Sequence, residues 1–280
     1  MQISVIIPTL NEEGYLPKLL ECIKHQTIKD YEVIISDAGS KDKTKEIAKK
    51  YGAKVVKGGM PAVGRNNGAK VAKGDFLFFF DADIKFSKDF FRISIDELDR
   101  RFLDLATCEA KPLSNLRLDK MFFKIADMVI KTAQFSRPLS GGYCIMVTKR
   151  LFERIGGFDE SITMAEDHDF VQRAAEFRPL RVLNDVSITM NIRRLKKEGR
   201  FGLAGKYIQS GLYMFFKGKI RSEIIEYDFG DFNNEKKLNA LEKKLIKFDH
   251  DLNRLLKING KKKSRISRFK KRFKDEIKKL

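Results

Sequence analysis

The first half of the chain alternates short apolar runs with amphipathic segments. Short apolar runs are typical of strands, whereas apolar residues that recur three or four positions apart indicate helices. The expected strands are residues 3–8, 32–36, 54–56 and 76–80. The expected helices are residues 16–23, 44–51, 61–72 and 87–101. Regular alternation of strands and helices predicts an α/β fold with a mostly parallel central sheet flanked by helices.

The second half is less regular. The strands expected there are residues 105–110, 143–148, 180–183 and 186–192, and the helices are residues 116–134 and 167–177. The helix over 116–134 carries more apolar residues than one buried helix face needs. Beyond Gly218 the chain becomes charged. We therefore expect one α/β domain over residues 1–218 and a charged helical C-terminal extension over residues 219–280, which ends in a basic tail.

Candidate binding residues, most of them polar or acidic, gather where the expected strands of the first half end. They are Pro8, Thr9, Glu12, Asp37, Asp81 and Asp83. Because the carboxyl ends of parallel strands meet at one edge of a sheet, these residues are expected to line a ligand crevice. The Asp37 carboxylate is suited to accept hydrogen bonds from a nucleotide base. In the D-x-D pair, one carboxylate would hold a ribose or a metal-bound water and the other a divalent cation, although D-x-D alone also fits a solvated turn.

Three arginines are expected near the same edge. Arg65, within Gly64-Arg65-Asn66-Asn67-Gly68, is able to meet a phosphate or anchor the nucleotide. Arg193 and Arg194 follow the last expected strand and would clamp a diphosphate, unless they are simply two exposed arginines. The first strand is not followed by G-x-G-x-x-G, and the chain has no G-K-[S/T] loop. Dinucleotide binding and P-loop chemistry therefore lose most of their support.

In their order along the chain, these motifs resemble those of the family-2 glycosyltransferases, inverting enzymes with the nucleotide-sugar-binding GT-A fold. The resemblance covers about residues 3–200. The matching segments are Val5 to Glu12, Val33 to Ser40 with Asp42 and Thr44, Gly64 to Ala69, Phe80 to Asp83, Gly141-Gly142, Gly156 to Glu160 and Glu166 to Asp169. The resemblance implies transfer of a sugar from a UDP- or GDP-sugar to an acceptor hydroxyl or a lipid-linked acceptor.

The resemblance also implies roles for single residues. Asp37 would contact the base, Asp81 the ribose or sugar, and Asp83 a Mg²⁺ or Mn²⁺ ion. Asp167, in the Glu-Asp pair, would be the catalytic base, and Gly142 precedes a strand where the family shapes the sugar and acceptor site. Ala38 departs from the family, which often has Asp or Gly there. The Q-x-x-R-W signature of processive polymer synthases is missing, which favours a single addition.

The formal net charge of +19 raises the question of a polyanionic partner. Residues 261–280 hold eleven Lys or Arg against two acids, so +9 of this charge lies in the tail. Nucleic-acid binding is one alternative, but basic residues are not interleaved with aromatics on a recognition motif, so we expect no nucleic acid partner. The other alternative is a sugar-nucleotidyltransferase. Such an enzyme would need a Gly-rich phosphate loop near the N-terminus, and this chain does not have one there.

The tail combines its charge with an apolar stripe at helical spacing, formed by Ile266, Phe269, Phe273, Ile277 and Leu280. Such a helix is suited to lie in an anionic membrane interface, and the alternative is that it docks on the body of the protein. Three scattered cysteines and no sign of a signal peptide or a membrane span favour a cytoplasmic protein. We therefore expect a cytoplasmic protein at the inner face of the membrane.

Overall fold

The computed structural model describes residues 2–200, 202–203, 205–206, 243, 246–247 and 250. Within this part, the strands are β1 (Ile3–Thr9), β2 (Tyr31–Asp37), β3 (Lys54–Lys57), β4 (Phe76–Phe80), β5 (Ile84–Lys85), β6 (Leu105–Pro112), β7 (Cys144–Thr148) and β8 (Arg181–Met190). The helices are α1 (Leu16–Lys24), α2 (Thr44–Lys50), α3 (Pro61–Lys70), α4 (Phe90–Arg100), α5 (Arg117–Ala133), α6 (Lys149–Arg154), α7 (Glu166–Ala175) and α8 (Arg193–Glu198). The 218/219 domain boundary and the apolar stripe of the tail lie outside the described residues.

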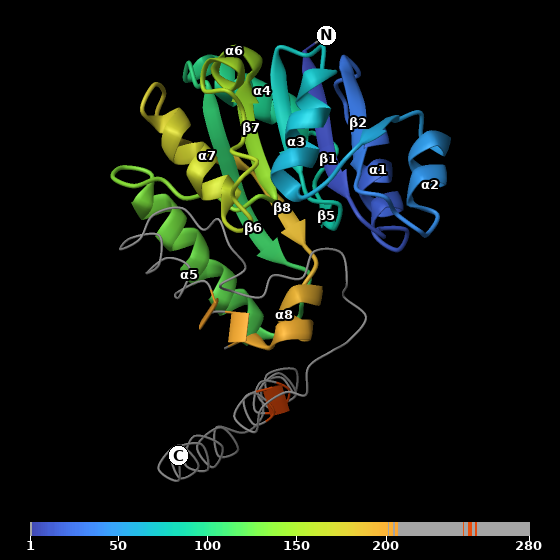
Figure 1. Cartoon of the computed structure of the whole chain (residues 1–280). Coiled ribbons are helices and arrows are strands. Elements are labelled where there is room, and N and C mark those ends of the chain that lie inside the picture. Colours follow the sequence, from blue (N-terminus) through green and yellow to red (C-terminus); the bar gives the residue numbers. More distant parts are fainter. Residues whose placement is uncertain are drawn as a thin grey trace.

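The described strands form one mixed sheet in the order β3-β2-β1-β4-β7-β6-β8-β5 (Figure 1). The first four strands in this order are parallel to one another, β4 and β6 pair antiparallel with β7, and β8 pairs parallel with β6. The carboxyl ends of β1, β2, β4, β6 and β8 therefore meet at one edge, together with the amino end of β7. We call this the site edge.

Strand β4 shows how the sheet becomes buried on both faces. Its side chains alternate between the two sides, as in any strand. Phe78 and Phe80 pack in the cluster that also holds α1 and α4, whereas Leu77 and Phe79 pack in the cluster that holds α3, α6 and α7. The continuous apolar run of β4 thus follows from helices on both faces, and the α/β class with a flanked central sheet is confirmed.

The structure corrects the strand expectations in the second half. The two strands expected over residues 180–183 and 186–192 are one strand, β8, with a register shift opposite Cys108 and Glu109. The polar pair Asn184-Asp185 sits at this irregularity, and its backbone N–H groups donate to the buried carboxylate of Glu97. The short strand β5 and the helix α6 were not expected from the sequence.

In the described part of the chain, each helix is either too short or too polar to traverse a lipid bilayer.

Candidate active site

Helix α3 lies very close to the sheet, and this position buries Arg65. A Cβ on Gly68 would be 2.4 Å from Ile6 Cγ2, and a Cβ on Gly64 would be 3.1 Å from Pro8 Cβ. Larger residues at these two positions would push the helix away from β1. The expected Gly64-to-Gly68 motif is thus a close-packing device, and Pro8 is part of the surface on which the helix rests. Arg65, between the two glycines, is only 3% exposed.

The buried guanidinium of Arg65 joins groups from three separate elements. Its Nη1 donates to Glu166 Oε1 at 2.5 Å, and its Nη2 lies 3.5 Å from Asp81 Oδ1 and 3.4 Å from the carbonyl oxygen of Gly142. The guanidinium also lies over the ring of Phe158, 5.3 Å from its centroid. Arg65 therefore ties the end of β4 to the start of α7 and to the loop before β7.

Asp167 lies in the first turn of α7, beside this arginine. The helix follows Ala165, which has the left-handed φ of 64°, and the carboxylate Oδ1 of Asp167 accepts the backbone N–H of His168 at 2.8 Å. A Cβ on Gly142 would lie 2.3 Å from Arg65 Nη2 and 3.4 Å from Asp167 Oδ2. Gly142 therefore leaves the space that lets the arginine and the second carboxylate oxygen approach each other.

A second arginine organises the other half of the D-x-D pair. Arg193 binds both carboxylate oxygens of Glu12, at 2.8 and 2.6 Å, and its Nε donates to Asp83 Oδ2 at 2.9 Å. Its guanidinium lies over the ring of Tyr15, 4.4 Å from the centroid. The first residue of α8 is thereby joined to the end of β1 and to Asp83. We call these residues, without Tyr15, the Arg193 cluster.

Burial changes the charge equilibria in both groups of residues. Desolvation raises the pKa of Glu12 to about 7, although the charge of Arg193 opposes the shift. The pKa of Asp83 is also raised, by burial first, while Arg193 and Arg194 act against that shift. Burial likewise raises the pKa of Glu166, against the opposing charge of Arg65. The site edge therefore concentrates carboxylates whose charged form depends on arginines.

Asp37 lies further along the site edge, at the end of β2. Its Oδ2 accepts the backbone N–H groups of Gly39 and Ser40, at 3.0 and 2.9 Å, and its Oδ1 accepts the hydroxyl of Thr9 at 3.3 Å. Thr9 and Asp37 are also paired across β1 and β2. The turn after β2 thus fixes the carboxylate, with Oδ1 on the side of Thr9.

The structure brings most of the expected residues into two linked groups. One group surrounds Arg65 and holds Asp81, Gly142 and Asp167. The other is the Arg193 cluster, which includes Glu12 and Asp83. Pro8, Thr9 and Asp37 line the neighbouring strand ends, and Arg194 is near enough for its charge to oppose the rise in the pKa of Asp83. Two residues have partners that were not expected from the sequence. Glu166 was expected only as the neighbour of Asp167 and in fact binds Arg65, and Arg193 was expected near this edge as a diphosphate contact but binds carboxylates.

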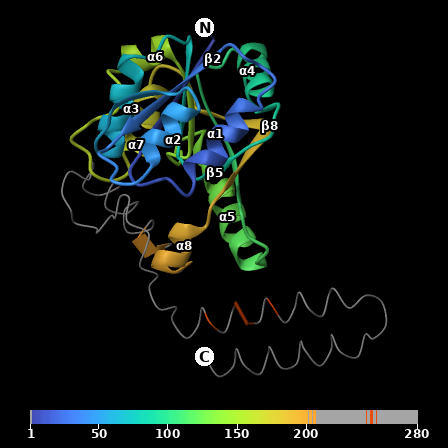
Figure 2. The same ribbon diagram turned by 90° about the vertical axis from the view of Figure 1, so that its right-hand side faces the viewer.

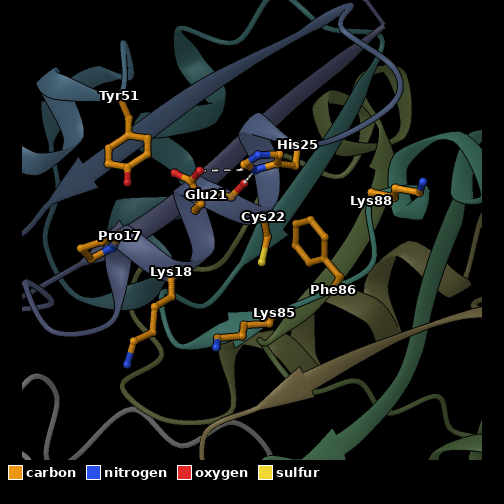
Figure 3. Close-up of a pocket in the computed structure, with 9 residues that line it drawn as sticks. All are labelled: Pro17, Lys18, Glu21, Cys22, His25, Tyr51, Lys85, Phe86 and Lys88. Carbon is orange, nitrogen blue, oxygen red and sulfur yellow. Dashed lines mark hydrogen bonds and ion pairs between the residues drawn. The ribbon is translucent and has the colours of Figure 1, made fainter.

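A hollow of about 560 Å³ lies along one side of α1 (Figure 3). It is lined by Pro17, Lys18, Glu21, Cys22, His25, Tyr51, Lys85, Phe86 and Lys88. Glu21 points toward His25, with 3.4 Å between Oε1 and Nδ1. Because the hollow shares no residue with the expected site, we do not include it in the candidate active site.

Comparison with known sequences identifies the domain. Residues 4–117 match the family described as Glycosyl transferase family 2. The chain is 28% identical over 188 residues to a Bacillus subtilis protein named "Uncharacterized glycosyltransferase EpsJ". This match covers 60% of this chain and 54% of that protein. It is 27% identical over 186 residues to the Staphylococcus aureus poly(ribitol-phosphate) beta-N-acetylglucosaminyltransferase TarS, covering 62% and 32%. The chain thus spans about half, or less, of these curated relatives.

Solved structures share the fold. S. aureus TarS 1-349 in complex with UDP-GlcNAc superposes with a TM-score of 0.57 at 25% identity, over 68% of this chain and 58% of that one. The mannosyltransferase PcManGT from Pyrobaculum calidifontis, in complex with GDP-Man and Mn²⁺, gives a TM-score of 0.60 at 20% identity, over 75% and 61%. Both are GT-A glycosyltransferases, so the expected fold is confirmed.

Proposed function

Because the chain carries a glycosyl transferase family 2 domain, we propose that the protein is an inverting glycosyltransferase. It moves a sugar from a nucleotide-sugar to an acceptor and depends on Mg²⁺ or Mn²⁺. The observation that carries the proposal is the convergence on Arg65, which links Asp81 to Glu166 and sets Asp167 beside them. In this proposal, Asp81 at the end of β4 serves the donor and Asp167 at the start of α7 serves the acceptor, and both lie near the same arginine.

Asp167 is the general base of this mechanism. A sugar hydroxyl is a weak nucleophile at neutral pH, so a carboxylate must take its proton as the oxygen attacks the anomeric carbon. Among the described residues, hydrogen bonds reach Oδ1 of Asp167, which leaves Oδ2 for the acceptor hydroxyl. Direct displacement of the nucleoside diphosphate by that oxygen inverts the anomeric centre and needs no covalent intermediate with the protein.

The strand ends hold the donor. Asp37 receives the base, with Thr9 and Pro8 beside it, and Asp81 receives the ribose or the sugar. Glu12, Gly142 and Arg194 complete the donor surface in this proposal. Both uracil and guanine offer an N–H to Asp37, so the donor is a UDP- or GDP-sugar.

Asp83 is the proposed metal ligand, and its surroundings fit such an ion. Among the described residues, His, Cys, Asp and Glu form no group of three able to hold a metal. Mg²⁺ needs no such cage, because it commonly binds one or two carboxylates and completes its shell with waters and substrate phosphates. Arg193 donates to Oδ2 of Asp83, so Oδ1 is the oxygen offered to the ion. When bound, the ion would neutralise charge on the leaving diphosphate.

The acceptor is a glycan or a lipid-linked molecule. In this proposal, residues 1–218 form the catalytic domain, residues 219–280 form a charged helical extension, and the basic tail at its end holds the protein at the inner face of the membrane as a peripheral cytoplasmic protein. The net charge of +9 on residues 261–280 and their apolar periodicity support this arrangement.

A donor screen tests the proposal. The full chain is incubated with UDP-, GDP- and dTDP-sugars, with Mg²⁺, with Mn²⁺ or with a chelator, and release of nucleoside diphosphate is measured. We expect one base to be preferred and the chelator to suppress release. A sugar-nucleotidyltransferase would instead form pyrophosphate from a nucleoside triphosphate and a sugar phosphate. Failure of every donor, without thermal stabilisation by UDP or GDP plus Mn²⁺, would reject the proposal.

A further inference from the structure

Helix α5 exposes an apolar stripe that the rest of the described structure leaves open to solvent. Met121, Ile125, Met128 and Val129 are between 47% and 61% exposed and lie on one side of the helix at spacings of four, three and one. Asp119 is the one buried residue of this 17-residue helix. Apolar residues scattered singly over a surface are ordinary, whereas a contiguous exposed set marks an interaction site. We call these four residues the α5 stripe.

The orientation of the α5 stripe is fixed by contacts on the opposite side of the helix. Asp119 accepts hydrogen bonds from Arg200 at 2.6 and 3.2 Å and from the hydroxyl of Ser114 at 2.5 Å. Phe123 packs against Ile192 and Leu195. A buried ion pair and an aromatic anchor thus hold the helix from its inner side, so the stripe is presented outward by the packing itself.

The charges beside the α5 stripe are of one sign. Lys120 and Lys124 are exposed, and each directly precedes a residue of the stripe, so they follow one of its sides. The acidic residues of the helix are held in ion pairs, because Asp119 is buried against Arg200 and Asp127 pairs with Lys131 at 2.7 Å. An apolar strip with cations along its border is the surface of a helix that lies in an anionic lipid interface.

The position of α5 agrees with such a surface. Strands β6 and β8 run toward the site edge; α8 lies beyond the sheet on that side, and α5 runs past the end of β6 on the same side (Figures 1 and 2). Helix α5 follows β6 directly, and α8 begins with Arg193, which contacts Asp83. A bilayer that contacts α5 would therefore lie on the side of the molecule to which the site edge points.

We propose that the α5 stripe, with Lys120 and Lys124, is a docking surface for an anionic lipid bilayer. Two other occupants are disfavoured by charge. A second copy of this chain that used the same surface would set Lys120 and Lys124 against their symmetry mates. The basic tail carries a net charge of +9 over residues 261–280 and would likewise bring cations to a basic face. Anionic lipid headgroups complement these lysines. The surface is independent of the sugar-transfer reaction and separate from the proposed tail anchor.

A single tryptophan can report this contact, because the sequence contains none. Met128→Trp introduces one in the α5 stripe of the full chain. The control is Phe102→Trp, at a position 92% exposed outside α5. With phosphatidylglycerol-containing vesicles, we expect the emission of the Met128→Trp protein to shift to the blue and to be quenched by brominated acyl chains. The control and pure phosphatidylcholine vesicles should give neither effect. An unchanged emission of Met128→Trp while the protein sediments with anionic vesicles would overturn the proposal.

A second set of variants measures the contribution of the stripe. Met121→Gln, Ile125→Gln and Met128→Gln are combined in the full chain, with Met60→Gln as the matched exposed control. We expect the triple variant to lose about ten-fold or more in vesicle partitioning while its thermal unfolding is unchanged. Lys120→Gln with Lys124→Gln should lose about five-fold per charge. Undiminished partitioning of the triple variant would overturn the proposal. So would the finding that the unmodified chain is a dimer and the triple variant a monomer, with no change in vesicle binding.

Discussion

The two aspartates of the D-x-D pair are separated by a single residue, yet each contacts a different arginine, and the two arginines differ in their surroundings. Arg65 is 3% exposed, sits in the middle of α3 and contacts Asp81 at 3.5 Å. Arg193 has a 12% exposed side chain, begins α8 and contacts Asp83 at 2.9 Å. Arg65 reaches Glu166 in α7 and Gly142 in the loop before β7, whereas Arg193 reaches Glu12 after β1. The pair thus joins two separate networks.

The difference indicates which half of the site is a fixed frame. Arg65 is confined between two glycines that press its helix against the sheet, and its charge is matched by Glu166. Removing one partner of such a buried pair strands the other charge, which is costly. Arg193 begins a six-residue helix that follows the sheet, over the face of Tyr15. We call Arg65 with Asp81, Gly142, Glu166 and Asp167 the Arg65 side. It is expected to govern stability and geometry, and the Arg193 cluster is expected to govern the response to metal and pH.

The largest effect is expected on the Arg65 side, from Asp167→Asn. Loss of the general base should lower turnover by about 10²–10⁴-fold, because general acid–base catalysis contributes that much. Donor affinity, measured by calorimetry, should stay close to that of the unmodified chain, because Asn keeps an oxygen for the N–H of His168. Asp169→Asn, in the same helical turn, is the control. If Asp167→Asn kept more than about a tenth of the turnover, the base would have to be another group.

The comparison of the two arginines is tested directly by Arg65→Met and Arg193→Met. Arg65→Met leaves Glu166 buried and uncompensated, so the free energy of unfolding should fall by about 3–5 kcal/mol. Adding Glu166→Gln should restore part of this loss. Arg193→Met should cost clearly less, because its side chain lies nearer to solvent. Urea unfolding of the three variants measures the difference, and equal losses for both arginines would contradict the proposed division.

Metal dependence sharpens the comparison at the level of the donor. Asp83→Ala should weaken nucleoside diphosphate binding about 10–100-fold with Mn²⁺ and little with chelator, since contacts to charged groups contribute about 1.5–3 kcal/mol. Asp37→Asn should weaken binding by a similar factor in both conditions. Asn retains an oxygen for the N–H groups of Gly39 and Ser40, so the turn is preserved. Calorimetry with and without Mn²⁺ separates the two, and identical profiles would contradict their assignment to metal and base.

The sequence predicted the first half of the site better than the second for a physical reason. Thr9 and Asp37 end parallel strands and Asp81 directly follows one. Because parallel strands share an edge, the proximity of these residues follows from local patterns alone. The same patterns do not encode long-range pairs. Arg193 and Asp83 are 110 positions apart, much further than neighbouring motifs of the first half. Only the path of β8 brings them together.

Strand β8 shows the same limit for the fold. Asn184-Asp185 has the composition of a turn, and the sequence therefore predicted two strands. The structure continues the strand through this pair, because Glu97 from α4 accepts the N–H groups that the irregular register leaves without a strand partner. Helix α5 is the opposite case. Its apolar excess was visible in the sequence, but only the structure shows whether those residues are buried. Helix α4 buries Phe90, Phe91, Ile95 and Leu98, whereas α5 buries Asp119 and leaves the α5 stripe exposed.

A further expected effect concerns pH and the Arg193 cluster. Burial raises the pKa of Glu12 from 4.5 to about 7, so between these values the folded chain holds a proton that the unfolded chain has lost. Stability then falls as pH rises through this window, because the folded state binds more protons. Glu12→Gln removes this group.

The free energy of unfolding of Glu12→Gln, relative to the unmodified chain, should therefore move in favour of the variant from pH 4.5 to pH 7. The expected change is about 2–3 kcal/mol, since one pKa unit corresponds to about 1.4 kcal/mol and the pKa of Glu12 is raised from 4.5 to about 7. Glu13→Gln, at an exposed neighbouring position, is the control and should show no such trend. Urea unfolding at three pH values across the window measures both. A difference that stays constant with pH would mean that Arg193 fully offsets the burial of Glu12 and that the Arg193 cluster is no more sensitive to pH than the Arg65 side.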